Sequence, residues 1–511
     1  MQRKKFITKN ILLQAFLDKY RLQNIVFILL IAYLLITRIL LIFSYSIDLD
    51  GAEFIFVYHV QRLIDHKPLY NNPTEFPFLA CLFVPVYLYI LKGVLSLFST
   101  SSQHDLHFMY VVSRAFSFVL FILQISIFIT YLRRRFQSSW RNIFILTAVY
   151  LLLISGHMYV VRPDALKFLL FTIGFILLIE YEFFKQHIFY LPGFLVVAVL
   201  NVFTKQDTIV YSCILIGCMF LVTRKIKYIA LLVSFLLVVV LVFLSMVHIF
   251  GNNFYTNVIL FNFQTIDDVF TSINMLLVIF SLGRISPLLL IVFVMLYKHK
   301  NALQKDAMVL FLIITAMAFL AVSHLFILRA GSNINYAYES IFLLLFLFSM
   351  LLKLDESTFK LSGKAMIFPI SYVLFLFATN TIIHNYRYNF KREEELKATY
   401  YKNIETNKQI KSVINNELVF YPNMEYGLFG RNNNLIYGYD YNIGRFISLV
   451  MPIEINTRLT FFDSKKYDDY FKNGKVKYIV SQTNKADFMQ KNYPNYTFQD
   501  SIGNLSVYAF K

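Results

Sequence analysis

Three carboxylates close together, Asp48, Asp50 and Glu53, are the residues of this sequence best suited to chemistry. They follow an apolar run at about 25–45, which is long enough to cross a bilayer. Carboxylates at a membrane boundary are costly unless they meet water, a partner or a substrate. A carboxylate placed there can accept a proton from a hydroxyl, so the stretch is a candidate for general-base catalysis. The alternative is a solvated acidic loop without a function.

The elements that must position these acids are transmembrane helices. Of the 511 residues, 58% are hydrophobic and only 15% are charged, which is rare in soluble domains. The net charge of +18 would suit a nucleic-acid-binding protein. The lysines and arginines, however, cluster in short loops between apolar runs, as the positive-inside pattern requires. The sequence therefore predicts an integral membrane protein without a nucleic-acid partner.

The positive-inside rule also orients the predicted helices. With the amino terminus inside, the first helix places the acids outside, in a long outer loop at 46–107. We expect the apolar run at 78–98 to be an interfacial or re-entrant helix, because a crossing there would put Arg133–Arg135 outside. The rule then predicts about 11 crossings, near 25–45, 108–131, 141–160, 165–183, 188–204, 207–223, 226–250, 273–297, 306–328, 338–354 and 365–384.

The composition changes near residue 385 from apolar to polar, rich in Asn and Tyr. We therefore predict two domains, a transmembrane domain at 1–384 and a small extracytoplasmic α+β domain at 385–511. In the second domain, the distribution of β-branched and aromatic residues predicts strands. The expected elements are a helix at 393–415, a short helix at 463–473, and strands at 418–421, 476–482 and 505–510.

The same topology brings many polar side chains to the outer face. They are Arg162, Asp164, Lys205, Asp207, Arg329, Asn333, Asn335 and Glu339, in addition to the three acids. Cations there could hold a lipid-linked phosphate leaving group while a carboxylate takes the proton of an acceptor hydroxyl. Individually, Arg162 and Lys205 could simply extend to water from helix ends, and Asp164 could cap its helix. Their coincidence on one face favours a site.

The order of these motifs resembles that of the GT-C glycosyltransferases, which use polyprenyl-phosphate sugars. In particular it is similar to the bacterial branch related to protein mannosyltransferases and the lipid A aminoarabinose transferase. Asp50-Gly51-Ala52-Glu53-Phe54 is similar to the family's Asp-Glu-x-Glu/Arg-Tyr loop, in which the first Asp is the proposed base. Four further stretches resemble family motifs: Lys67-Pro68-Leu69-Tyr70, Val161-Arg162-Pro163-Asp164, Phe203-Thr204-Lys205-Gln206 and the stretch from Gly331 to Glu339. The resemblance as a whole spans about residues 25–384.

The resemblance implies a polytopic α-helical GT-C-like fold with interfacial helices in the first outer loop. It implies that Asp50 is the catalytic base and that Glu53 assists it. The residues expected at the donor phosphate are Arg162, Asp164, Lys205, Gln206 and Arg329. Further substrate contacts are expected from Asp48, Tyr70, Asn333, Asn335, Tyr336 and Glu339.

This sequence departs from the family pattern at two places. Gly51 replaces the second acid of the Asp-Glu pair, and Glu75-Phe76-Pro77 stands where the aminoarabinose enzyme has Glu-Lys-Pro. A lysine expected at the phosphate is therefore absent there. Asp48-Leu49-Asp50 has the Asp-x-Asp form that holds a divalent metal in oligosaccharyltransferase relatives. Hard cations need several oxygen ligands, so we expect neither a metal nor another cofactor.

These features predict a membrane glycosyltransferase at the outer face of the bacterial cytoplasmic membrane. It would move a sugar from a polyprenyl-phosphate donor to a lipid, glycan or protein acceptor, in contact with membrane lipids. One alternative is a polytopic transporter or lipid-linked glycan flippase, although transporters place ionisable groups near mid-bilayer and often have internal repeats. A polysaccharide polymerase or ligase is another, although such enzymes have their large loop late in the chain.

Overall fold

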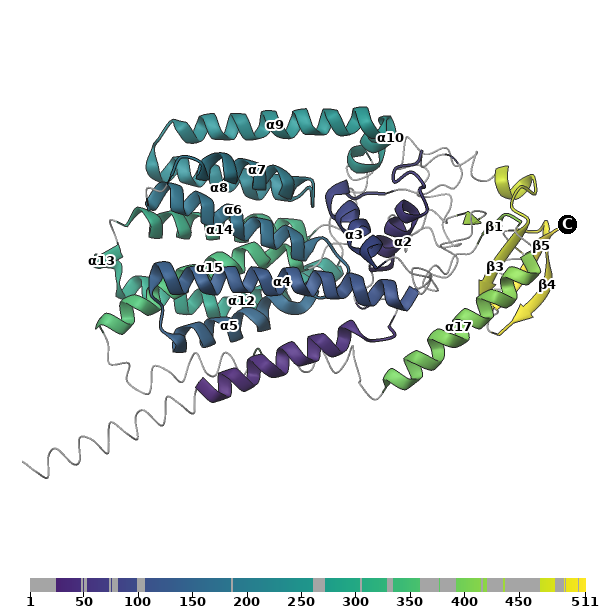
Figure 1. The fold of residues 1–511 in the computed structure, drawn as a ribbon, viewed down its shortest axis with the longest axis horizontal. Coiled ribbons are helices and arrows are strands. Elements are labelled where there is room, and N and C mark those ends of the chain that lie inside the picture. Colours follow the sequence, from purple (N-terminus) through teal and green to yellow (C-terminus); the bar gives the residue numbers. More distant parts are fainter. Residues whose placement is uncertain are drawn as a thin grey trace, which may run out of the picture.

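Figure 1 shows a bundle of long helices, with the shorter helices α2 (Glu53–Ile64) and α3 (Pro85–Leu97) and a carboxy-terminal sheet beyond one end of it. This computed structural model describes residues 24–46, 49, 53–72, 75, 81–98, 106–184, 187–260, 272–303, 306–328, 334–358, 376, 392–414, 417–420, 435–436, 469–482, 491, 493–503 and 505–511.

Six helices of the described part are long and apolar enough to cross a membrane. They are Asn24–Ile42, α4 (Leu106–Phe136), α9 (Lys227–Phe250), α12 (Ser272–Lys298), α14 (Ala307–Ile327) and α15 (Tyr338–Thr358), the last preceded by a 3-10 turn, η5 (Ile334–Ala337). Four more predicted crossings coincide with α5 (Trp140–Ile154), α6 (Asp164–Phe183), α7 (Tyr190–Val202) and α8 (Thr208–Thr223). The crossing predicted at 365–384 lies outside the described residues, apart from Leu376.

Burial distinguishes the inner helices from the lipid-facing ones. In its most apolar window, α15 is 89% buried inside the protein, whereas α9 is only 17% buried. The exposed side chains of α9 are apolar, among them Val233, Leu237, Val240 and Leu244. Such a surface is stable in contact with lipid and not with water. The chain is therefore a multi-pass membrane protein.

Between the first helix and α4 lie two short helices that pack together, α2 (Glu53–Ile64) and α3 (Pro85–Leu97). The helix α3 has 13 residues and is about 20 Å long. Leu88, Leu91 and Leu95 of α3 are buried, so one face packs against the protein. The Val86 N–H donates to the Phe203 carbonyl at the end of α7, 3.1 Å away. The predicted interfacial helix at 78–98 is thus a short helix docked on the bundle.

The opposite end of the bundle carries ion pairs between neighbouring helices. Arg135 at the end of α4 pairs with Glu180 of α6. Lys225 and Lys227, at the start of α9, both pair with Glu182 of α6.

Four shorter elements connect the long helices of the described part. They are η2 (Ser155–His157), α10 (Asn252–Tyr255), η3 (Thr256–Leu260) and α13 (Lys300–Leu303).

The carboxy-terminal part is a small α+β unit. It contains α17 (Glu393–Ile414), β1 (Val419–Phe420), β2 (Leu435–Ile436), β3 (Tyr478–Gln482), β4 (Tyr496–Ile502) and β5 (Leu505–Phe510). The strand order is β2-β1-β3-β5-β4, parallel from β2 to β3 and antiparallel thereafter. Ile410 and Ile414 of α17 pack against Val419, Val480 and Val507 of the sheet.

The helix and the three strands predicted for this unit are confirmed, and two strands were missed. β4 is exposed at five consecutive positions, so it lacks the alternation that marks a half-buried strand. β2 has only two residues. The helix expected at 463–473 is described only from Asp469 onward, where it is helical. The boundary at 384/385 lies outside the described residues and stays a prediction.

Candidate active site

Glu53, at the start of α2, is a buried carboxylate that accepts hydrogen bonds from three directions. Its Oε2 lies 2.6 Å from Nη2 of Arg114 in α4, and both side chains are 0% exposed. The carboxylate also accepts the backbone N–H groups of Leu49 and Val161, each at 2.8 Å. A buried charge is tolerated only when it is paired and hydrogen-bonded in this way. Glu53 therefore joins α2 to α4 and to the segment before α6.

Arg114 extends the same network to the end of the first helix. Its guanidinium donates to the carbonyl oxygens of Ser44 and Ser46, at 3.1 and 2.7 Å. Asp48 and Asp50 lie outside the described residues, but Leu49 between them is described and only 4% exposed. Arg114 and Glu53 thus fix the chain on both sides of the two acids. Sequence reasoning missed Arg114 because it lies inside an apolar run.

A second charged cluster lies where α6 begins, α7 ends and α15 begins. The Asp164 carboxylate accepts from Lys205 Nζ at 2.8 Å and from Asn335 Nδ2 at 2.7 Å, and it pairs with Arg162 at 3.2 Å. Asp164 does not cap α6, since the cap position is Pro163 and no side-chain cap bond forms there. The structure therefore brings together four residues that the sequence predicted, from three different elements.

Lys167, one turn into α6, joins this cluster to two further acids. Its Nζ lies 2.9 Å from Asp207 and 2.7 Å from Glu339, and its side chain is 2% exposed. The Tyr336 ring lies close to both lysines, with its centroid 4.5 Å from Lys205 Nζ and 5.7 Å from Lys167 Nζ. Ammonium groups are attracted to aromatic faces at such distances. Glu339 and Tyr336, predicted as substrate contacts, thus lie beside the lysines.

Lys205 lies in the loop between α7 and α8 and keeps its positive charge. Burial would lower the pKa of Lys205, but the charges of Asp164 and Asp207 outweigh burial and raise that pKa above its usual value. The side chain is 13% exposed and donates one hydrogen bond, to Asp164, within the part of the chain that the structure describes. An ammonium has three donors. Lys205 therefore retains donor capacity for an anion.

Two other predicted site residues hold the outer loop in place. Gln206 Nε2 donates to the Leu82 carbonyl at 3.2 Å, which joins the loop after α7 to the segment before α3. The Tyr70 hydroxyl donates to the Phe83 carbonyl at 2.7 Å, and its ring packs edge-on against Phe250 and Phe254. Arg329 and Asn333 lie outside the described residues.

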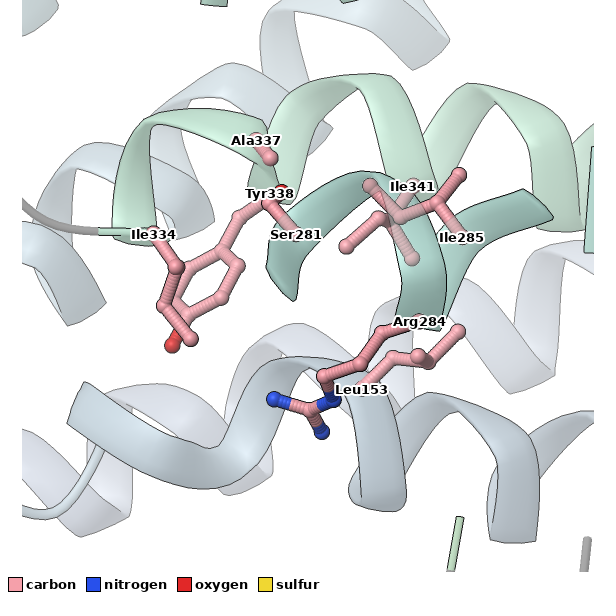
Figure 2. Close-up of a pocket in the computed structure, with 8 residues that line it drawn as sticks. All are labelled: Leu153, Ser281, Arg284, Ile285, Ile334, Ala337, Tyr338 and Ile341. Atoms are coloured by element: carbon pink, nitrogen blue, oxygen red, sulfur yellow. The ribbon is translucent and has the colours of Figure 1, made fainter. Parts of the chain in front are cut away.

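A pocket between α5, α12 and the start of α15 contains a cation that the sequence analysis did not select. Its lining is mainly apolar, with Leu153, Ser281, Arg284, Ile285, Ile334, Ala337, Tyr338 and Ile341 (Figure 2). Arg284 lies within the membrane-spanning part of α12 and donates to the Leu152 carbonyl at 2.6 Å. The Tyr338 hydroxyl is buried without a hydrogen-bond partner among the described residues. A single arginine within an apolar run is the sequence signal that would have found this pocket.

A metal site is not evident in the described residues, where no three His, Cys, Asp or Glu side chains lie close enough to hold an ion. Asp48 and Asp50, the only acids that the sequence linked to a metal, are outside them. The expectation that the protein uses no metal therefore stays a prediction.

No protein-family model matches this sequence, and no curated protein matches it either. The fold, however, is similar to that of solved structures. ArnT from Cupriavidus metallidurans bound to undecaprenyl phosphate aligns with a TM-score of 0.55 and 14% identity, over 94% of this chain and 97% of ArnT. ArnT in the apo state aligns with a TM-score of 0.56 at the same identity and coverage. The archaeal oligosaccharyltransferase AglB from Archaeoglobus fulgidus aligns with a TM-score of 0.46 and 13% identity, over 93% of this chain and 74% of AglB.

At 14% identity, the similarity to ArnT establishes the fold and not the reaction. It extends over nearly the whole of both chains. The GT-C-like fold predicted from the order of the motifs is thereby confirmed. This chain is a multi-pass membrane protein with a GT-C fold.

Proposed function

We propose that the protein is a membrane glycosyltransferase that moves a sugar from a polyprenyl-phosphate donor to a hydroxyl of a lipid, glycan or protein acceptor. The observation that carries this proposal is the whole-chain similarity to ArnT, a protein crystallised with undecaprenyl phosphate. The charged cluster around Lys205 supports it, because it lies at the same end of the bundle as α2 and α3. The protein thus combines a fold similar to that of ArnT with cations that could bind a lipid-linked phosphate.

Asp50 is the proposed general base. The acceptor oxygen attacks the anomeric carbon, the bond from that carbon to the phosphate oxygen breaks, and the acceptor proton passes to the Asp50 carboxylate. Polyprenyl phosphate is the leaving group. The network of Glu53 and Arg114 supports this role, because it anchors residues on both sides of Asp50 to the bundle. Glu53 would then assist by positioning, and Asp48 would contact the substrate.

Lys205 and Arg162 are proposed to bind the donor phosphate, with Arg329 as a further cation. The contacts of Asp164 support this, since one carboxylate holds both Lys205 and Arg162 in place. The sugar would lie near Tyr70, Asn333, Asn335, Tyr336 and Glu339.

The site is proposed to face the outside of a bacterial cytoplasmic membrane. The ion pairs at the far end of the bundle involve Arg135, Lys225 and Lys227. Basic residues favour the cytoplasmic side of a membrane. Their position opposite α2 and α3 therefore supports an extracytoplasmic site and carboxy-terminal unit.

A transporter or glycan flippase is the second candidate function. Arg284 within α12 favours it, because ionisable residues inside spanning helices often mark transport pathways. The two candidates differ in chemistry, since a flippase leaves the sugar–phosphate bond intact.

Deletion of the gene tests the proposal directly. We expect the deletion strain to accumulate a polyprenyl-phosphate monosaccharide and to lose one sugar from an envelope glycan, lipid or protein, as measured by mass spectrometry of lipid extracts and envelope fractions. Re-expression of the wild-type protein should reverse both changes. An unchanged pool of lipid-linked monosaccharides would contradict the proposal, and retention of a complete lipid-linked glycan on the inner leaflet would favour the flippase.

A further inference from the structure

The amino-terminal end of α17 contacts the segment that leads from the first helix to the acidic loop. The Glu393 carboxylate accepts the backbone N–H of Tyr45 at 2.6 Å and the hydroxyl of Ser44 at 2.8 Å. Glu393 lies 349 residues from Ser44 in the chain, so this contact joins the carboxy-terminal unit to the transmembrane part. Hydrogen bonds to a carboxylate are stronger than those between neutral groups.

Aromatic contacts reinforce this docking. The Tyr45 ring stacks on His107 at the start of α4, with a centroid distance of 3.9 Å and an interplanar angle of 3°. The His107 N–H donates to the Tyr400 hydroxyl of α17 at 3.1 Å, and Lys397 Nζ lies 5.5 Å from the Tyr45 ring centroid. Three side chains of α17 therefore hold the same few residues.

The segment from Ser44 to Ser46 is bound from two sides. Glu393 takes the N–H of Tyr45 and the hydroxyl of Ser44, whereas Arg114 donates to the carbonyls of Ser44 and Ser46. Arg114 in turn pairs with Glu53, which binds the backbone of Leu49. A continuous set of hydrogen bonds thus runs from the carboxy-terminal unit to the residue that precedes Asp50.

We propose that Glu393 is a positioning residue for sugar transfer, through which docking of the carboxy-terminal unit fixes residues 44–46 ahead of the acidic residues. The inference rests on the proposed function, in which Asp50 is the base. Glu393 touches no reacting atom and acts by fixing residues 44–46, only a few residues before the base. Small displacements of a catalytic group are costly, because proximity and orientation supply much of the rate.

Hydrogen exchange measured by mass spectrometry tests the contact without any assay of activity. The full-length protein is compared in lipid nanodiscs as wild type, Glu393→Ala, Glu393→Asp and Glu394→Ala. Glu394 is the matched control, because it is the next residue of α17 and is exposed. We expect amide exchange in the peptide containing Tyr45 to be about 10-fold faster in Glu393→Ala, roughly the loss of one charge-assisted bond. Glu393→Asp should restore part of the protection, and Glu394→Ala should match the wild type.

Steady-state kinetics test the positioning role. We expect Glu393→Ala to lower kcat by about 10-fold while the KM for the lipid donor changes less than about 2-fold, because the loop and not the donor site is displaced. Ser44→Ala removes one donor to Glu393, whereas Glu393→Ala also removes the acceptor of the Tyr45 N–H, so we expect a smaller loss of kcat in Ser44→Ala. Glu394→Ala should transfer sugar at the wild-type rate.

Two results would overturn the inference: unchanged exchange at Tyr45 in Glu393→Ala, or faster exchange there with unaltered kcat. An equal loss of kcat in Glu394→Ala would also do so, since it would indicate a general effect of α17. Failure of the proposed function is distinguishable, because it would appear as an absence of sugar transfer by the wild-type protein itself.

Discussion

Lys205 and Asp164 lie 2.8 Å apart across the ends of α7 and α6, and Asn335 donates to the same Asp164 oxygen from η5, at 2.7 Å. Asp164, at the start of α6, therefore links Lys205 after α7 to Asn335 in η5. An ammonium that donates one bond to a fixed carboxylate is oriented and still has donors for a phosphate. This relationship makes Lys205 the cation whose substitution is most informative.

Lys205→Ala should weaken use of the lipid donor without unfolding the protein. We expect KM for the donor to rise about 10-fold or more, since a charge-assisted bond to phosphate is lost. Lys205→Arg should rescue only partly, because the planar guanidinium cannot reproduce a point charge held by Asp164. Kinetics of purified variants in nanodiscs measure both. Wild-type kinetics in Lys205→Ala would show that the side chain only extends to water.

The charge on Lys205 should persist to alkaline pH. Its pKa in the folded protein is raised above the value of an exposed lysine, mainly because the acids around it outweigh the effect of burial. The stabilisation that depends on this charge is complete below the unfolded-state pKa of about 10.4 and is lost as pH rises through the higher folded-state value. Between pH 7 and about 10, donor binding by the wild type should therefore fall no more than donor binding by Lys205→Arg. A fall in wild-type binding near pH 8, absent from Lys205→Arg, would contradict this.

The pair of Glu53 and Arg114 should be essential for stability. Both side chains are fully buried, so Glu53→Gln or Arg114→Met leaves an uncompensated charge, which typically costs about 3–5 kcal/mol. Thermal unfolding in detergent should show a large fall in Tm for each single variant. The double variant Glu53→Gln/Arg114→Met should be less unstable than the sum of the two, because no charge stays unpaired. Additive losses would indicate that the two side chains are not coupled.

The outer loop and the α6–α7 turn should lie on opposite sides of the membrane. In a background without Cys81, Cys213 and Cys218, we would place a single cysteine at Asp65 or at His187, both exposed positions. Asp65→Cys should react with an impermeant thiol reagent added to intact cells, and His187→Cys should react only after permeabilisation. The reverse labelling would place the charged cluster on the cytoplasmic side and contradict the proposed donor.

Much of this fold can be predicted from the lengths of the apolar runs and the positions of the charged residues. Helices α4, α9, α12, α14 and α15 lie where apolar runs of 18 or more residues predict crossings, because the bilayer imposes that length. The short length of α3 was not visible in its composition. The position of Arg133–Arg135 predicts only that the run at 78–98 does not cross, since a crossing there would place these arginines outside.

The candidate site was only partly predictable, because its pairings join distant positions. Glu53 and Asp164 are noticeable in the sequence as acids at helix ends. Their partners Arg114 and Lys205 are 61 and 41 residues away, and only the packing of α4 and α7 brings them together. Arg284 was missed because a single cation in an apolar run does not interrupt the predicted helix.

The variant Asp50→Asn tests most directly whether Asp50 is the base for sugar transfer. The substitution keeps the size of the side chain and removes its basicity, so turnover should fall by roughly 100-fold or more. Donor binding should survive, because a base acts mainly in the transition state. The measurement is sugar transfer from a polyprenyl-phosphate donor by purified, folded Asp50→Asn, with Asp48→Asn as the matched control and a milder loss expected there. Wild-type turnover in Asp50→Asn would contradict the account, and full activity in both variants would exclude this loop as the catalytic centre.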